Sequence, residues 1–197
     1  MVQRCKWADF NDLMKKYHDE EWGTPIHNDR ILFEFLMLEG AQAGLSWNTI
    51  LQKRENFRKV FDNFDYKKIA KYNEKKVEEL LNDVGIIRNR LKIEAAIANA
   101  KALLKVQDEF GSFSNYIWKF VNDKPIINKF KTLEELPSKI EQSELISKDL
   151  KKRGFKFVGP TIIYSFMQAV GMTNDHTTDC FRYREINQAL KNSANIK

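Results

Sequence analysis

The stretch KKRGFKFVGPTI at residues 151–162 decides the fold prediction, because it joins two helical patterns through a short turn with a glycine at each end. Before the turn, Ser143 can cap a helix that runs to Arg153, and Gly154 suits the left-handed backbone that ends a helix. After the turn, Pro160 suits the first turn of an apolar helix. The sequence therefore predicts two helices joined by a tight hairpin.

The other segments carry helical periodicity, and no run of residues alternates as a strand does. A central helix is expected from Asn28 or Asp29, because the segment that follows is apolar nearly all round. Eight glycines and four prolines in 197 residues leave few breaks. The predicted fold class is all-α. Further helices are expected after Ser46, after Asp65, after Asn73 as far as Gly85, and at 88–107 and 113–121.

The length of the chain suits one domain. Residues 123–137 are the weakest part of the helical pattern, and we interpret them as a loop. We predict a single helical domain at 1–187 and a frayed polar tail at 188–197. No apolar run approaches the ~20 residues of a membrane span, and no secretory signal is visible. Two cysteines exclude a disulfide scaffold, so we expect a cytoplasmic, bacterial-type intracellular protein with no membrane partner.

Basic residues gather at the predicted hairpin. Helix ends can offer backbone amides to a phosphate, and nearby lysine and arginine attract a nucleic acid backbone whatever its sequence. The chain has 33 Lys and Arg against 27 Asp and Glu, a net charge of +6 that is consistent with DNA binding. A solvated charged helix face would explain the same lysines. The residues concerned are Lys148, Lys151, Lys152, Arg153 and Lys156.

The two cysteines and two of the three histidines form a candidate metal site. His176 and Cys180 are four residues apart, so a helical turn can aim both at one point. Cys5 and His18 lie near the other end of the chain. Two cysteines and two histidines complete a tetrahedral zinc set with no open position. The spacing is not that of a zinc finger, and buried thiols with ordinary histidines are the alternative. A metal here would join the two ends of the chain.

A carboxylate and several aromatic residues suggest a second site. Glu39 ends the apolar central helix, where a buried carboxylate is costly without a partner. Trp7, Tyr17 and Trp47 lie in the same quarter of the sequence. An acid among aromatic faces suits a flat ligand that is cationic or donates hydrogen bonds. Alternatively, Glu39 reaches water and the tryptophans fill the core.

The loop that follows Glu39 also has two interpretations. Gly44 and Leu45 lie in a flexible segment of small residues at 42–47. A leucine in such a loop can wedge into a base stack. The loop can equally be an ordinary helix connection.

Together, these motifs resemble the DNA-3-methyladenine glycosylase I family, from Cys5 to about Cys180. The resemblance implies a fold of the helix-hairpin-helix glycosylase superfamily. It implies base-excision repair of alkylated double-stranded DNA: 3-methyladenine is flipped out and its N-glycosidic bond hydrolysed, which leaves an abasic site. The motifs are CKW at 5–7, YHDEEWG at 17–23, LEGAQAGLSW at 38–47, KKRGFKFVG at 151–159 and NDH at 174–176.

The resemblance also implies roles for individual residues. One structural zinc ion is expected on Cys5, His18, His176 and Cys180. Glu39 and Tyr17 are the expected catalytic residues, and Trp47 and Trp7 are further walls of the base pocket. Gly44 and Leu45 are expected to fill the gap in the duplex. Lys152, Arg153, Lys156 and Gly159 are expected to hold phosphates.

At two positions, the roles of the family's residues do not carry over directly to this chain. Met14 stands where relatives have a tyrosine, so the pocket wall differs there. Asp175 is the nearest candidate for the aspartate that the wider superfamily uses to steady the sugar cation, although the methyladenine family is described as lacking it. We expect the chain to act as a monomer. The competing functions are a DNA-binding module without chemistry and a zinc hydrolase, which would need an open coordination position.

Overall fold

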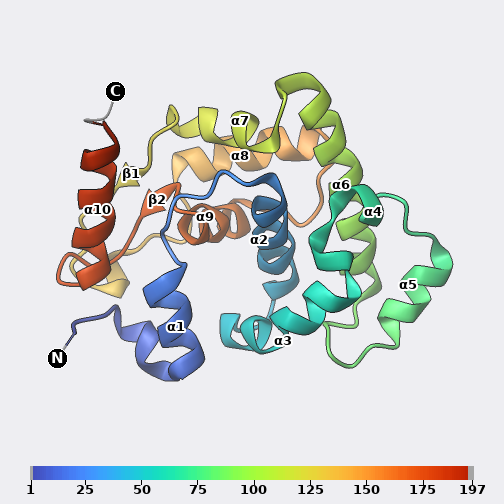
Figure 1. Cartoon of the computed structure of the whole chain (residues 1–197), viewed down its shortest axis with the longest axis horizontal. Helices are drawn as coiled ribbons and strands as arrows, with labels where there is room; N and C mark the ends of the chain where they lie inside the picture. The colour runs from blue at the N-terminus through green and yellow to red at the C-terminus, as the bar shows by residue number, and fades with distance from the viewer. Residues whose placement is uncertain (1, 195–197) are drawn as a thin grey trace.

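The structure, a computed structural model, describes residues 2–194 and is helical almost throughout, as predicted (Figure 1). Its α-helices are α1 (Asp12–Glu20), α2 (Asp29–Gln42), α3 (Trp47–Val60), α4 (Tyr66–Ile69), α5 (Glu74–Leu81), α6 (Arg90–Phe110), α7 (Phe113–Trp118), α8 (Glu141–Lys152), α9 (Pro160–Ala169) and α10 (Phe181–Ala194). Four short 3-10 helices connect them: η1 (Lys6–Phe10), η2 (Asp62–Phe64), η3 (Lys119–Val121) and η4 (Leu133–Glu135). Strands β1 (Ile126–Ile127) and β2 (Thr173–Asn174) form one parallel pair.

Helix α2 lies at the centre, as its apolar sequence predicts (Figure 1). Its apolar residues point in all directions around the axis, and α3, α6, α7 and α9 pack against it. The Asn28 side chain caps the helix by accepting hydrogen bonds from the amides of Arg30 and Ile31. The fully buried residues of α2 are Leu32, Phe33, Phe35, Leu36 and Leu38.

Capping side chains set most of the other helix starts. The side chains of Ser46, Asp65 and Asn73 accept hydrogen bonds from the first turns of α3, α4 and α5, as expected. The prediction for Ser143 was wrong. It lies inside the first turn of α8, where its hydroxyl oxygen accepts from the Ile140 amide and its O–H donates to the Ile140 carbonyl. The helix therefore begins three residues earlier than predicted.

Two predicted irregular segments are more ordered than expected. The loop at 123–137 contains β1, which pairs with β2 through Ile126 opposite Thr173. Helix α10 continues to Ala194, so most of the expected frayed tail is helical; residues 195–197 lie outside the described residues. Ile186 is buried and packs close to Gly23, a contact that attaches this helix to the N-terminal part of the chain.

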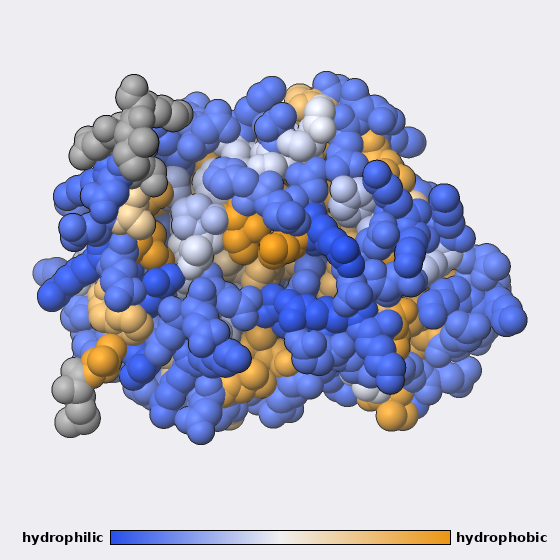
Figure 2. Space-filling model, in the orientation of Figure 1, coloured by the Kyte–Doolittle hydropathy of each residue, from blue (hydrophilic) through white to orange (hydrophobic). Residues whose placement is uncertain are grey.

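The N-terminal segment and the start of α10 lie side by side on one side of the molecule (Figure 1). The amide of Phe181, the first residue of α10, donates to the carbonyl of Gln3. The face of the molecule that is seen in Figure 2 is largely hydrophilic, with separate apolar areas. Within residues 2–194, none of the helices is both long enough and apolar enough to cross a membrane.

Candidate functional site

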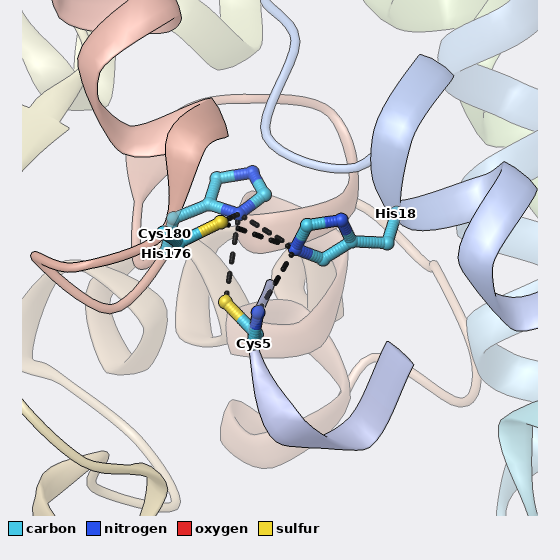
Figure 3. A group of neighbouring side chains, drawn as sticks. All are labelled: Cys5, His18, His176 and Cys180. Atoms are coloured by element: carbon cyan, nitrogen blue, oxygen red, sulfur yellow. Dashed lines mark hydrogen bonds between the residues drawn. The ribbon is translucent and has the colours of Figure 1, made fainter. Parts of the chain in front are cut away.

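The four predicted metal ligands come together where the N-terminal segment meets the start of α10 (Figure 3). Cys5 precedes η1, His18 lies on α1, and His176 and Cys180 come from the segment between β2 and α10. All four are fully buried, and their donor atoms lie within 4.8 Å of one another. The cluster could therefore hold a metal ion.

The donor geometry fits a small tetrahedral ion. In a tetrahedral zinc site, nitrogen donors lie about 3.3 Å apart, and nitrogen and sulfur donors about 3.6 Å apart. Here His18 Nε2 lies 3.2 Å from His176 Nδ1. Cys180 Sγ lies 3.4 Å and 3.5 Å from these two nitrogens, and Cys5 Sγ lies 3.6 Å from His176 Nδ1. All four distances agree with a tetrahedral set to within about 0.2 Å.

Hydrogen bonds fix which nitrogen of each histidine faces the cluster. His18 Nδ1 donates to Asp19 at 2.8 Å, and Arg4 holds the same carboxylate. His176 Nε2 donates to the Trp22 carbonyl at 3.1 Å. The opposite nitrogens, His18 Nε2 and His176 Nδ1, are therefore free to act as ligands, the arrangement found around metal-bound histidines.

The two buried thiols shift each other's pKa in opposite directions. A hydrogen bond with Cys5, and then those with the histidines, lowers the pKa of Cys180 well below its usual value. The same bond, together with burial, raises the pKa of Cys5. Two buried thiolates repel each other, so both can be ionised only when a cation lies between them.

A cavity of about 290 Å³ lies beside this cluster and contains all four predicted pocket residues. It opens between the first helices, the α2–α3 region and α9. Its size is close to the lower end of small-molecule sites. The lining residues are Trp7, Met14, Tyr17, Trp22, Glu39, Gln42, Trp47, Leu136, Ser165 and Gln168.

Aromatic rings form the walls of the cavity. The Tyr17 ring lies 5.4 Å from the Trp47 ring and 6.2 Å from that of Trp7. The Trp7 ring also contacts His18, at 5.2 Å, and the Trp22 ring lies 4.5 Å from His176. The cavity and the metal cluster therefore share walls.

Glu39 is the acid of the cavity. It is 4% exposed, and its carboxylate has no hydrogen-bond partner in the described part of the chain. Burial raises the pKa of Glu39 to about 8. Burial, and then the charge of Glu39, raises the pKa of Tyr17, so this hydroxyl stays protonated and can donate. An uncompensated acid in an apolar cavity is suited to a cationic ligand.

Several lining residues were not predicted from the sequence. Ser165 and Gln168 lie three apart on α9, so both face the cavity. Their signal was faint: two polar residues in an otherwise apolar helix. Leu136 comes from the loop at 123–137, whose path could not be inferred from local pattern. Gln42 lies one helical turn after Glu39, a spacing that could have identified it.

A second chamber of about 170 Å³ shares Glu39 with the first. Gly44 and Leu45 lie at this chamber, together with the start of α9. Gly44 has a φ of +80°, which favours glycine, and Leu45 is 41% exposed. The loop therefore presents an apolar side chain to solvent at the edge of the cavities.

The predicted hairpin connects α8 to α9 and is held rigidly. Asn99 on α6 clamps it: the Lys156 amide donates to Asn99 Oδ1 at 2.7 Å, and Asn99 Nδ2 donates to the Lys156 carbonyl at 3.0 Å. Ser147 donates to the Val158 carbonyl at 2.6 Å. Lys152 and Lys156 are exposed, and Gly159 occupies the cap position of α9.

Arg153 differs from its lysine neighbours. Its guanidinium pairs with Glu109 at 2.6 Å and Asp149 at 2.7 Å. It also lies over the rings of Phe110, at 4.9 Å, and Tyr116, at 5.0 Å. These contacts already engage the charge, so Arg153 anchors the hairpin to α6 and α7.

Comparisons with known proteins show which family the chain resembles. The family model described as methyladenine glycosylase matches residues 7–183. The chain is 50% identical over 182 residues to DNA-3-methyladenine glycosylase 1 of Escherichia coli (strain K12), which covers 92% of this chain and 97% of that protein. It is 47% identical over 180 residues to DNA-3-methyladenine glycosylase of Haemophilus influenzae, with coverage of 91% and 97%.

A solved structure shows the same similarity in three dimensions. 3-Methyladenine DNA glycosylase I from Staphylococcus aureus, whose structure addresses the recognition of 3-methyladenine, superposes with a TM-score of 0.88 at 35% identity. The match covers 90% of this chain and 95% of that chain. The chain therefore belongs to the methyladenine glycosylase family.

Proposed function

We propose that the cavity around Glu39 is the site where this glycosylase receives 3-methyladenine flipped out of DNA and hydrolyses its N-glycosidic bond in base-excision repair. One observation carries the assignment: a buried, unpaired carboxylate lies among aromatic rings, in a cavity large enough for one base. The reaction leaves an abasic site.

The charge of the substrate explains how so few groups suffice. Methylation at N3 makes the base in DNA cationic, so it leaves the sugar without being protonated. Tyr17 and Trp47 stack on the base, and Trp7 forms a further wall. The cation favours the ionised form of Glu39, which then accepts hydrogen bonds from the amino edge of adenine. A neutral base gains no such charge pairing, and the site thereby discriminates against undamaged DNA.

We also propose that α8, the hairpin and α9 form a helix-hairpin-helix unit that holds the DNA backbone. Lys152 and Lys156 attract phosphates, and the amides around Gly159 bind one of them. Gly44 and Leu45 fill the space that the flipped nucleotide leaves. Arg153 stabilises the hairpin through its ion pairs with Glu109 and Asp149.

The metal in this proposal is a single structural zinc ion. The two-sulfur, two-nitrogen donor set and its spacing support zinc. Cys5, His18, His176 and Cys180 would leave no position for water, so the ion takes no part in the hydrolysis. It joins the two ends of a single domain at 1–187. The described residues of one chain contain both sites, which favours a monomer. Its substrate in this proposal is double-stranded DNA inside the cell.

The test is incubation with alkylated duplex DNA, with released 3-methyladenine scored against 7-methylguanine. The chain is expected to release 3-methyladenine preferentially. Glu39→Gln is expected to lose this activity while remaining folded. Glu20→Gln, the same chemical change at an exposed position on α1, is the matched control and keeps the rate. Full excision by Glu39→Gln would show that the pocket is assigned wrongly.

A further inference from the structure

Asp175 is a buried carboxylate that neither cavity contains. It is 1% exposed and follows β2. Its Oδ2 accepts from the Tyr164 hydroxyl at 2.6 Å, from Gln168 Nε2 at 2.8 Å and from the Thr173 hydroxyl at 3.2 Å. Its Oδ1 accepts from Asn128 Nδ2 at 2.6 Å. Both oxygens are thus engaged by the protein.

This geometry argues against direct contact between Asp175 and the substrate. A carboxylate that steadies a sugar cation needs a free oxygen at the reacting centre. Four donors surround Asp175, and it lines neither the 290 Å³ cavity nor the 170 Å³ chamber. Asp175 is connected to the larger cavity by its hydrogen bond with Gln168, which lines that cavity.

The hydrogen bond to Asp175 fixes the orientation of the Gln168 amide. Asp175 Oδ2 accepts from Gln168 Nε2, so the NH2 group of Gln168 is turned toward Asp175. The carbonyl oxygen, Gln168 Oε1, is then directed away from Asp175. It accepts no hydrogen bond within residues 2–194 and is not sealed from solvent. The wall of the cavity therefore presents a fixed, unused acceptor.

We propose that Asp175 is a positioning residue for base selection: it holds Gln168 so that its carbonyl oxygen serves, beside Glu39, as a second acceptor for the amino group of adenine. The inference rests on the proposed base pocket. Guanine carries a carbonyl oxygen where adenine carries its amino group. That oxygen is itself an acceptor and would lie against the two acceptors of the pocket, which is repulsive. Asp175 thereby strengthens the preference for 3-methyladenine over 3-methylguanine without touching either base.

The experiment measures the ratio of 3-methyladenine to 3-methylguanine released from alkylated duplex DNA. Asp175→Asn lets the amide of Gln168 rotate, because asparagine can donate to the glutamine oxygen as well as accept from its nitrogen. The ratio is expected to fall about fivefold, the effect of one hydrogen bond. Gln168→Leu is expected to lower it by the same factor, and the double variant is expected to lower it no further.

Thr173→Val is the matched control, because it removes another donor to the same Asp175 oxygen and leaves Gln168 in place. Its stability is expected to fall while its release ratio stays unchanged. Metal content is measured throughout, since Asp175 adjoins His176, and the release ratios are compared between chains reconstituted to equal zinc content. An unchanged ratio in Gln168→Leu, or additive effects in the double variant, would overturn the proposal. Absence of any 3-methyladenine release from the unmodified chain would instead refute the proposed function.

Discussion

Replacing Glu39 by glutamine should stabilise the free protein while it removes activity. Burial raises the pKa of Glu39 from its ordinary value of 4.5 to about 8. Between these values the folded chain binds the Glu39 proton more tightly than the unfolded chain does. The stability contribution of this residue is therefore fully present at low pH and is lost as the pH rises toward 8.

The magnitude follows from the pKa. Each pKa unit is worth about 1.4 kcal/mol, so between low pH and pH 7.5 the raised pKa of Glu39 lowers the free energy of unfolding by about 4 kcal/mol as an upper limit. Water in the open cavity lowers that cost, and we expect Glu39→Gln to raise the free energy of unfolding by about 2 kcal/mol at this pH. For a chain of this size, that corresponds to a rise in Tm of about 4–8 °C.

The assay is thermal unfolding of the wild-type chain, Glu39→Gln and the exposed control Glu20→Gln, from pH 4.5 to 8.5. The amide has its own hydrogen-bonding cost, but that cost is the same at every pH. The diagnostic quantity is therefore the change in the Tm difference with pH. The difference should grow as the pH rises and be absent in the control. A Tm difference that stays constant from pH 5 to 8 would refute the raised pKa and the reasoning built on it.

Four other variants test the remaining parts of the site. Metal analysis should find one zinc per chain, and chelation or Cys180→Ser should lower Tm, because the ligands are far apart in sequence. Asn99→Ala removes both hydrogen bonds that clamp the Lys156 backbone, and should weaken duplex binding in a titration while leaving affinity for the free base unchanged. Lys152→Ala should lower the salt dependence of DNA binding by about one counterion, whereas Arg153→Ala should mainly lower Tm, since its charge is already paired.

Local chemistry made the helices predictable, and its failures have local causes. Asn28, Ser46 and Asp65 cap helices because each precedes an apolar-periodic run. Ser143 misled because a serine in the first turn and a serine at the cap look alike in sequence. The continuation of α10 was missed because Ile186 packs close to Gly23, far away in the chain.

The candidate site divides in the same way. Glu39 and Tyr17 stand out in sequence, since a carboxylate at the end of an apolar helix and a local group of aromatic residues are both unusual. The inward direction of Ser165 and Gln168 depends on the rotation of α9 against α2, which no local pattern encodes. Resemblance to a family identifies the residues within its motifs. The polar residues that line the cavity outside those motifs can be identified only once the fold is known.

The metal cluster and the base cavity are mechanically one unit. Trp7 lies two residues after Cys5, and Tyr17 directly precedes His18. The Trp22 carbonyl accepts the hydrogen bond from His176. Three residues of the cavity lining are thus attached to three of the four candidate ligands. In the proposed site, an ion that draws these ligands together would set the spacing of the rings, and so how the base is held, without a catalytic position of its own.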